Sequence, residues 1–546
     1  MRVTSTMMDE ALTITRLLEH GRRNHGHREV VTRRENGLER HALASTYQRI
    51  RRLATGLGAL GVADGDVVAT LCWNHQEHLE AYFAVPCSGA VLHPLNLRLS
   101  PRQLAGVVDD LGGRVVIVDD VLVELLAETL EHARSPRTFV VVGDGDASAL
   151  RPHGEVVRYG EVLAAGPEPG PWPRVDEHQA AAACHTSGTT GAPKGVVYSH
   201  RSIWTHTYGA LAGGFRLRDA DRLLLAVPLF HANAWGLVHI AWLQGTSLLL
   251  PGPHPGPEDL ATLIVDEAAT CAAAVPTVLS SLLAVDPPRG PDLASLRWVL
   301  TGGSAVAPSL IEAFEHRHDI DVVQAWGMTE MSPSGAVAVP QPDADPDRAR
   351  EQRLRSGRLV SGIEVRLIGE DGRCQPFDGA SPGEIQVRGP WVTGRYHRDA
   401  DPDAFDDGWL RTGDVGVVDE RGYLQLVDRT KDLVKSGGEW ISSVALEAAL
   451  QSHPDVRACA VVARADEHWS ERPVACVVPE PGRDPDVDEL DHHLSDLVAR
   501  WWRPDAYAVI TELPTTSVGK PDKRRLRETV ASGELALRAV TRAIRD

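Results

Sequence analysis

The sequence predicts an α/β protein with a large N-terminal domain of parallel and mixed sheets, a β-rich subdomain at its end and a small C-terminal α+β domain. Three observations predict this class. Short apolar runs alternate with helical patterns before about residue 357, turn-punctuated alternating strands follow from there, and helix and strand patterns mix after residue 431. The length of 546 residues also exceeds that of one ordinary domain.

Residues 44–130 show the alternation of helices and strands most clearly. We expect an amphipathic helix, a buried strand, a helix that leads into a strand, and a further strand, in TYQRIRRLATGLGALGV, DVVATLCW, HLEAYFAVPCSGAVLHPLN and RVVIVDD. This order predicts a parallel sheet with crossover helices. The Gly-, Pro- and Asp-rich residues 143–176 predict an irregular connection.

Later apolar runs continue the sheet. The runs RLLLAVPLF, TSLLLPG, CAAAVP and RWVLTGG contain or end in Pro or Gly, as buried strands that open into loops do. In open α/β sheets, ligands bind beyond such strand ends.

The last third of the chain changes character. SGRLVSGIEVRLI, GEIQVRGP and GYLQLVDR read as strands of a β-rich unit, and VALEAALQSHP, VRACAVVARA and PVACVVP as a helix and two strands. We therefore predict an N-terminal domain over 1–430, its β-rich subdomain over about 357–430, and a C-terminal domain over 431–546.

Composition excludes several classes of protein. A formal net charge of −19 disfavours general binding of nucleic acid or anionic membranes. The seven cysteines are scattered without a CxxC pair, and His75 and His78 lack the HExxH order, so we expect neither a disulfide framework nor a zinc site. The N-terminal segment lacks signal-peptide features and no long apolar run occurs, so we expect a cytoplasmic protein without a membrane span.

The run HTSGTTGAPKG, residues 185–195, is the most distinctive loop of the chain. Its three glycines and four hydroxyl side chains expose backbone N–H and O–H donors, which suits a polyphosphate, and Lys194 adds a positive charge. The lysine is followed by Gly195 rather than by Ser or Thr, so the loop is not a Walker A motif.

Six further motifs follow this loop in a fixed order, and together they resemble the adenylate-forming (ANL) enzymes: acyl- and aryl-CoA synthetases, firefly-type luciferases and peptide-synthetase adenylation domains. The motifs are PLFHANAWG (228–236), TGGSA (301–305), QAWGMTE (324–330), GWLRTGD (408–414), DRTKDLVKSGGEWIS (428–442) and PTTSVGKPDK (514–523). FHANAW, SGGEWISS and WWRPD are most similar to medium- and long-chain fatty acyl-CoA synthetases.

This resemblance implies an AMP-forming acid–thiol ligase. In the family a carboxylate attacks the α-phosphorus of ATP, giving acyl-AMP and pyrophosphate, and a thiol, usually coenzyme A, then displaces AMP. ATP, Mg²⁺ and coenzyme A are the implied cofactors, and a small-molecule acid is the implied partner. The C-terminal domain is implied to be mobile, and the oligomeric state stays open, a homodimer included.

The resemblance also assigns the phosphate and metal contacts. Thr186 and Glu330 match catalytic residues that help to hold Mg²⁺, and Thr329 matches a residue that contacts the α-phosphate. A hard cation that bridges phosphates prefers oxygen ligands of this kind. The implied phosphate loop further contains Ser187, Gly188, Thr189, Thr190, Gly191 and Lys194.

The implied nucleoside site comes from three motifs. Trp326, where the family more often has Tyr, would stack on adenine, and Asp414 and Arg429 would bind the ribose hydroxyls. The remaining implied nucleotide contacts are Gly303, Ser304, Ala305, Gly327 and Met328.

Lys520 in TSVGK matches the family's catalytic lysine, which balances charge on the carboxylate and the α-phosphate in the first step. Lys431 matches the hinge about which this lid domain is thought to rotate. Rotation would bring in the loop made of Lys435, Gly437, Gly438, Glu439 and Trp440 beside the pantetheine arm.

The acid pocket is implied by PLFHANAWG and the residues around it. His231 matches a residue near the acyl carboxylate and the thiol path, and Trp235 resembles a gate of the acyl tunnel. The pocket set further contains Gly302, His239, Trp242 and Ser334. Because relatives that act on fatty acids usually have smaller or apolar residues at several of these positions, we expect a short, aromatic or polar acid.

Two alternatives stay open on the sequence alone. One is a specialised biosynthetic enzyme that adenylates a polar or aromatic acid, or nitrite as a diazotising enzyme does, and uses an amine or a carrier-protein thiol. The other is a non-catalytic adenylate-binding relative. The presence of Thr186, Glu330, Asp414, Arg429 and Lys520 disfavours the second alternative.

Overall fold

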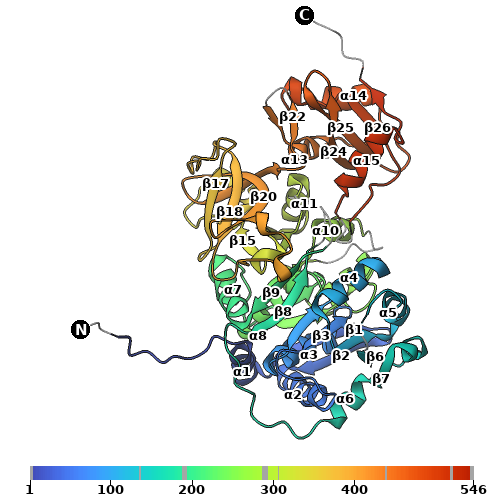
Figure 1. The fold of residues 1–546 in the computed structure, drawn as a ribbon. Coiled ribbons are helices and arrows are strands. Elements are labelled where there is room, and N and C mark those ends of the chain that lie inside the picture. Colours follow the sequence, from blue (N-terminus) through green and yellow to red (C-terminus); the bar gives the residue numbers. More distant parts are fainter. Residues whose placement is uncertain are drawn as a thin grey trace, which may run out of the picture.

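The computed structural model describes residues 4–134, 137–186, 193–285, 293–304, 306–436, 439–516 and 520–540. It confirms the α/β class: two large sheets with helices form the greater part of the molecule, and a smaller α+β unit follows at the C-terminal end (Figure 1).

The first sheet is mostly parallel and comes from the N-terminal part of the chain. Its strand order is β7-β6-β5-β3-β4-β8-β9, and the last pair is antiparallel. The strands are β3 (Val67–Leu71), β4 (Val91–Pro94), β5 (Val115–Asp119), β6 (Arg137–Val142), β7 (Gly154–Arg158), β8 (Ala180–His185) and β9 (Gly195–Ser199). The predicted phosphate loop therefore leaves this sheet at the end of β8.

The second sheet runs in the order β17-β18-β20-β21-β16-β15-β14-β13-β12-β10-β11-β1-β2, with β19 beside β20. Its parallel part contains β1 (Glu29–Arg34), β10 (Arg222–Leu225), β11 (Ser247–Leu250), β12 (Cys271–Ala273), β13 (Trp298–Gly302) and β14 (Asp321–Gly327), with β2 (Gly37–Ala42) antiparallel at the edge. The antiparallel part contains β15 (Ser334–Val337), β16 (Gly357–Leu359), β17 (Glu364–Ile368), β18 (Gly383–Arg388), β19 (Phe405–Asp406), β20 (Trp409–Val418) and β21 (Tyr423–Arg429). The predicted β-rich segment is thus continuous with this sheet through β15, β16 and β21.

Two buried helices belong to the core that joins the two sheets. Every residue of α3 (Gln76–Cys87) is buried, including the polar residues of its first turns, and α8 (Leu237–Gln244), which is mostly apolar on all sides, is buried from Leu237 to Leu243. The other helices of this region are α1 (Ile14–His25), α2 (Leu43–Ala59), α4 (Pro101–Leu111), α5 (Val123–Leu130), α6 (Tyr159–Ala165), α7 (His200–Gly213), α9 (Pro257–Asp266), α10 (Pro276–Leu283), α11 (Pro308–His318) and α12 (Pro346–Leu354). No described helix combines the length and apolar character that a membrane span requires.

The C-terminal unit has its own sheet, in the order β23-β22-β25-β26-β27 with β24 beside β25. Its elements are β22 (Val434–Ser436), β23 (Glu439–Ile441), α13 (Ser443–Gln451), β24 (Val456–Asp466), β25 (Ser470–Pro479), α14 (Val487–Leu494), β26 (Ala506–Val509), α15 (Lys523–Ser532) and β27 (Arg538–Ala539). The unit also contains the short 3-10 turn η7 (Arg500–Trp502), and the turns outside it are η1 (Asp120–Leu122), η2 (Ser148–His153), η3 (Ala232–Gly236), η4 (Thr329–Met331), η5 (His397–Asp399) and η6 (Pro402–Ala404).

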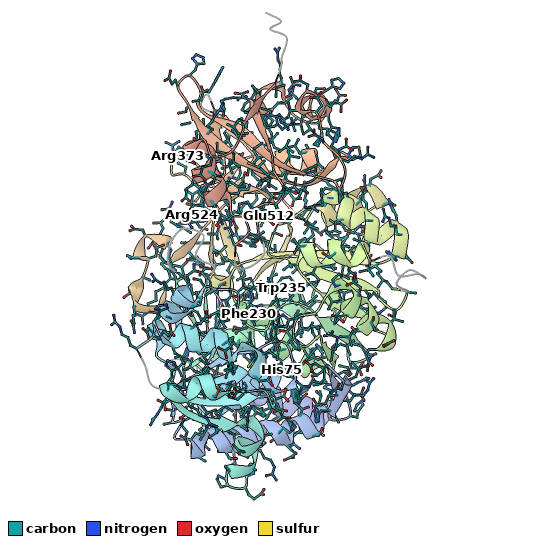
Figure 2. All side chains as sticks on the ribbon, turned by 90° about the vertical axis from the view of Figure 1, so that its right-hand side faces the viewer. His75, Phe230, Trp235, Arg373, Glu512 and Arg524 are labelled. Atoms are coloured by element: carbon teal, nitrogen blue, oxygen red, sulfur yellow. The ribbon has the colours of Figure 1, made fainter. Side chains whose placement is uncertain are left out.

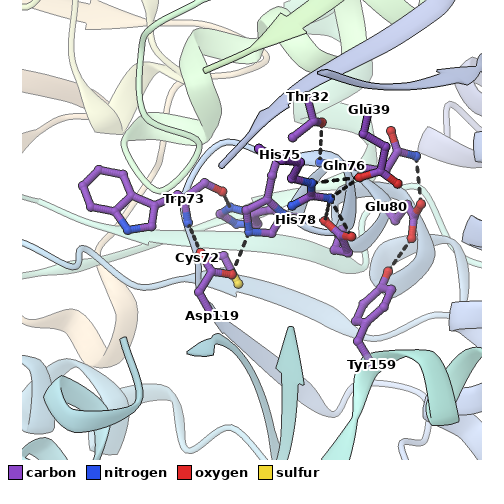
Figure 3. Close-up of polar contacts among 12 residues, drawn as sticks. Thr32, Glu39, Cys72, Trp73, His75, Gln76, His78, Glu80, Asp119 and Tyr159 are labelled. Carbon is purple, nitrogen blue, oxygen red and sulfur yellow. Dashed lines mark hydrogen bonds and ion pairs between the residues drawn. The ribbon is translucent and has the colours of Figure 1, made fainter. Parts of the chain in front are cut away.

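A buried ion network joins the two large sheets at the turn before α3 (Figure 3). His75 Nε2 donates to Asp119 at 2.7 Å and His75 Nδ1 lies 2.9 Å from Glu77, which also accepts two bonds of 2.7 Å from Arg34. Burial opposes charge on the ring, but the two carboxylates raise the pKa of His75 to about 10. Cys72 lies within 4.8 Å of His75 and Asp119, yet carboxylates occupy both ring nitrogens, so we interpret the cluster as an ion network rather than a metal site.

His75→Leu should lower the free energy of unfolding by about 3–5 kcal/mol at pH 7, because it leaves Asp119 as a buried, unpaired charge. The pKa of His75 is raised to about 10 in the folded state, so the ion-pair stabilisation is complete below about pH 6.5 and is lost as the pH rises through about 10. Urea denaturation at pH 7 and pH 10.5, with the exposed His178→Ala as control, measures this. An equal loss of unfolding free energy at both pH values would contradict the conclusion that His75 is charged at pH 7.

Candidate active site

A cavity of about 420 Å³ contains residues from most of the predicted motifs. They come from the end of β8, the turn after β10, the ends of β13 and β14, strands β20 and β21 and the C-terminal unit. Trp235, one of the lining residues, lies at mid-height in the molecule, above His75 (Figure 2). The predicted residues in this lining are Thr186, Lys194, His231, Trp235, Gly302, Gly303, Trp326, Gly327, Met328, Thr329, Glu330, Ser334, Arg429, Lys431 and Lys520.

The two ends of the predicted phosphate loop meet at one side of the cavity. Thr186 N donates to the carbonyl of Lys194 at 2.9 Å, and Lys194 N donates to Thr186 Oγ1 at 3.1 Å. The Lys194 ammonium pairs with Asp401 and lies 4.9 Å from the ring centroid of Tyr396. Ser187, Gly188, Thr189, Thr190 and Gly191 lie outside the described residues.

Glu330 is a buried carboxylate at the same side of the cavity, 5% exposed. Burial raises its pKa, and the hydrogen bond that it accepts from Tyr396 opposes the shift. In the part of the chain that the structure describes, Glu330 forms no ion pair. A buried carboxylate without an ion-pair partner among the described residues, in a cavity that Thr186 also lines, fits a hard divalent cation such as Mg²⁺.

Asp414 is oriented by two neighbours that line the cavity. Trp326 Nε1 donates to Asp414 Oδ2 at 2.8 Å, and Arg429 Nε lies 3.2 Å from Asp414 Oδ1. The Trp326 ring packs on β15, where a Cβ at Gly335 would lie 2.7 Å from Cζ3. The indole N–H therefore fixes a carboxylate that is suited to accepting hydrogen bonds from hydroxyls.

Lys520 enters the cavity from the C-terminal unit. Its backbone N donates to Thr516 Oγ1 at 3.3 Å and its carbonyl accepts from Thr516 N at 2.7 Å, which fixes the base of the side chain. Burial is the main cause that lowers the pKa of Lys520 to about 8, Arg429 and Lys431 lower it further, and Asp414 opposes them.

Acid-dependent pyrophosphate release should fall as the pH rises through about 8, because Lys520, with a pKa lowered to about 8, then loses the charge assigned to it. In Lys520→Arg this fall in rate should occur only above pH 10, since a guanidinium stays protonated up to that pH. The measurement is kcat/KM between pH 6.5 and 10. If kcat/KM fell at the same pH in both proteins, the fall would have to be caused by a group other than Lys520.

The turn that carries Trp235 is strained. Residues 232–236 all have positive φ, from 44° at Ala232 to 72° at Gly236, a conformation that costs non-glycine residues about 1–2 kcal/mol each. Such strain is typical of functional sites. His231 precedes this turn; burial, with a contribution from Lys520, lowers its pKa to about 4, so the ring is neutral at pH 7.

Several predicted residues lie elsewhere. Ser304 is exposed and is not among the described lining residues, so its role as a nucleotide contact stays a prediction. Lys435 and Trp440 pair with each other across β22 and β23, and neither belongs to the described lining. Ala305, Gly437, Gly438 and the side chain of Glu439 are outside the description.

Trp242 and His239, which were expected to narrow the pocket, are not part of the described lining. Trp242 is fully buried against α1, donates from Nε1 to the carbonyl of Leu18 at 3.0 Å, and fills the space that a Cβ at Gly21 would enter at 2.3 Å. His239 is buried with its ring 5.4 Å from that of Phe83.

The sequence reading missed Tyr396 and Asp401, which hold Glu330 and Lys194. The available signal was GPWVTGRYHRDADPD, a loop after a strand that mixes Gly, an aromatic residue and acids. It also missed Phe215, which lines the cavity just after α7.

Two family models match this chain. The model described as AMP-binding enzyme covers residues 18–397, and the model described as AMP-binding enzyme C-terminal domain covers residues 445–520. The chain belongs to the AMP-binding enzyme family. The resemblance to adenylate-forming enzymes is therefore confirmed, and the matched residues include Lys520 and the cavity residues at the ends of β8, β13 and β14.

Relatives match the protein over almost its full length. It is 44% identical over 533 residues to the long-chain-fatty-acid–CoA ligase of Thermus thermophilus, with 96% of each chain covered. It is 38% identical over 538 residues to the medium-chain-fatty-acid–CoA ligase of Ectopseudomonas oleovorans, with 98% of each covered. In fold it is similar to the anthranilate CoA ligase AuaEII in complex with anthranoyl-AMP, with a TM-score of 0.84 at 24% identity over 96% of this chain and 99% of that chain.

Proposed function

We propose that this AMP-binding enzyme is an acid–thiol ligase that activates a carboxylic acid with ATP to an acyl-adenylate, releases pyrophosphate, and transfers the acyl group to coenzyme A. One observation carries the proposal: Lys520 of the C-terminal unit lines the same cavity as Thr186, Lys194, Glu330 and Arg429. The full-length identity to two fatty-acid–CoA ligases supports it.

The first half-reaction brings a carboxylate toward a polyphosphate, so it needs alignment and charge neutralisation more than a protein nucleophile. In this proposal Lys194 and the ends of the phosphate loop hold the β- and γ-phosphates. Asp414 and Arg429 bind the ribose, and the Trp326 ring lies beside the adenine.

Lys520 then lies between the two reacting anions. Its charge stabilises the developing negative charge on the α-phosphate oxygens, since cations act more strongly in a site of low dielectric. Glu330, with Thr186, would hold Mg²⁺, which would neutralise part of the negative charge of the phosphates.

The second half-reaction uses residues that lie outside the cavity here. We propose that the C-terminal lid, residues 431–546, rotates about Lys431 against the N-terminal domain, residues 1–430. Lys520 then leaves, and Lys435, Glu439 and Trp440 approach the thiol path beside His231. The β22–β23 pairing keeps Lys435 and Trp440 adjacent, so they would move as one unit.

The test is incubation with ATP, Mg²⁺ and a panel of fatty, benzoic and cinnamic acids, each with and without coenzyme A, with products identified by mass. The expected result is acid-dependent pyrophosphate and an acyl-CoA mass when coenzyme A is present. Acid-dependent pyrophosphate without a thioester would instead favour an amine or a carrier-protein thiol as the acceptor.

A further inference from the structure

The wall of the cavity near Trp235 contains a polar pair. Ser334 lines the cavity together with Phe215 and Trp235, and its Oγ lies 2.9 Å from Nε2 of His206 on α7. His206 is 1% exposed. A Cβ at Gly236 would lie 2.5 Å from His206 Cε1, so the ring is pressed against the turn that carries Trp235.

A row of buried histidines continues behind this wall. His239 on α8 is near enough to affect the pKa of His206, and His200 at the start of α7 affects that of His239. Burial lowers the pKa of His206 and of His239 to about 3 and that of His200 to about 4, so all three rings are neutral at pH 7. Within the described residues, Nε2 of His239 and Nε2 of His200 have no hydrogen-bond partner.

This arrangement is unfavourable beside a hydrocarbon tail. A serine hydroxyl offers one donor and two acceptor positions, and the contact with His206 uses one of them. A neutral imidazole nitrogen is a donor or an acceptor according to its tautomer. The Ser334 hydroxyl can therefore accept from His206 and donate to a ligand, or donate to His206 and accept from a ligand. An alkyl group against Ser334 leaves the remaining positions unpaired, whereas a hydroxyl, carbonyl or N–H group satisfies one of them.

We infer that Ser334, positioned by His206, is the specificity-determining residue of the acid pocket, and that the acid carries a hydrogen-bonding group at the end away from its carboxylate. This inference rests on the proposed function and names its substrate class. Ser334 and Phe215 line the cavity and His206 and His239 are buried, so in this inference the acid is a short or aromatic one rather than a long alkyl acid.

The experiment compares acids of equal shape in which a distal hydroxyl replaces a methyl group: 5-hydroxypentanoic with hexanoic acid, 4-hydroxybenzoic with 4-methylbenzoic acid, and 3-(4-hydroxyphenyl)propanoic with 3-(4-methylphenyl)propanoic acid. The readout is kcat/KM for pyrophosphate release, with kcat and KM determined separately. The proteins are the wild type, Ser334→Ala, His206→Phe and His206→Gln. Ser295→Ala, which removes a buried hydroxyl without a partner among the described residues, is the control.

The wild type and Ser295→Ala should prefer the hydroxy acid of at least one pair by about tenfold, mainly through KM. Ser334→Ala and His206→Phe should reduce this preference below about threefold, and His206→Gln, which keeps a hydrogen-bonding group, should restore part of it. A wild type that prefers the methyl acids in all pairs, or an unchanged ratio in Ser334→Ala, would overturn the inference and leave the proposed function intact. No acid-dependent pyrophosphate from any acid would overturn both.

Discussion

Lys520→Ala should reduce acid-dependent pyrophosphate release by about 10²–10³-fold, a loss of roughly 3–4 kcal/mol of transition-state stabilisation. The reason is the position of Lys520. It enters the cavity from a loop that Thr516 anchors, and its charge interacts with those of Asp414 and Arg429. Thioester formation from supplied acyl-AMP and coenzyme A should change by less than about threefold. Stopped assays of the two half-reactions measure this.

Arg524→Ala is the matched control for Lys520→Ala. Arg524 is a cation four residues away in the same unit, but its side chain is 62% exposed and it is not among the described lining residues. It should leave both half-reactions unchanged. If Lys520→Ala impaired the two half-reactions equally, Lys520 would have a structural role rather than the role assigned to it.

Glu330→Gln should reduce pyrophosphate release by about 100-fold at ordinary Mg²⁺ concentrations and should move the Mg²⁺ dependence to higher concentration. The amide keeps the shape of the side chain and can still accept from Tyr396, but it removes the negative charge that a divalent cation requires. A Mg²⁺ titration of the initial rate measures both effects.

Tyr396→Phe tests the orientation of Glu330 while leaving its carboxylate in place. It removes the hydrogen bond to Glu330 but keeps the ring beneath Lys194. Its loss of rate should be below about tenfold, with a nearly unchanged Mg²⁺ dependence. Equal effects of the two substitutions, or a Glu330→Gln enzyme with the Mg²⁺ dependence of the wild type, would contradict a metal-binding role.

Residues within several motifs were predictable because those motifs follow a buried apolar strand and form a polar turn. The predicted run RWVLTGG became β13, and Gly302 and Gly303 at its end line the cavity, as expected for a strand of an open α/β sheet. Lys520 could be placed there only through the resemblance to a family, since nothing in the local sequence distinguishes it from Lys523, which instead pairs with Glu447.

Residues behind the cavity were not predictable, because burial on all sides removes the pattern that tells one face of a helix from another. Helix α8 is buried from Leu237 to Leu243, so its sequence does not show that Trp242 packs on α1 and that His239 lies behind His206. His206 itself is one of several polar residues of α7, and only the fold brings it to Ser334.

The most direct test of the account is acid-dependent exchange of labelled pyrophosphate into ATP in the absence of coenzyme A. We expect exchange that requires both an acid and Mg²⁺, that is accompanied by an acyl-AMP mass, and that is lost in Lys520→Ala. Formation of ADP and phosphate, or exchange that does not depend on any acid, would contradict the claim that this cavity joins a carboxylate to the α-phosphate of ATP.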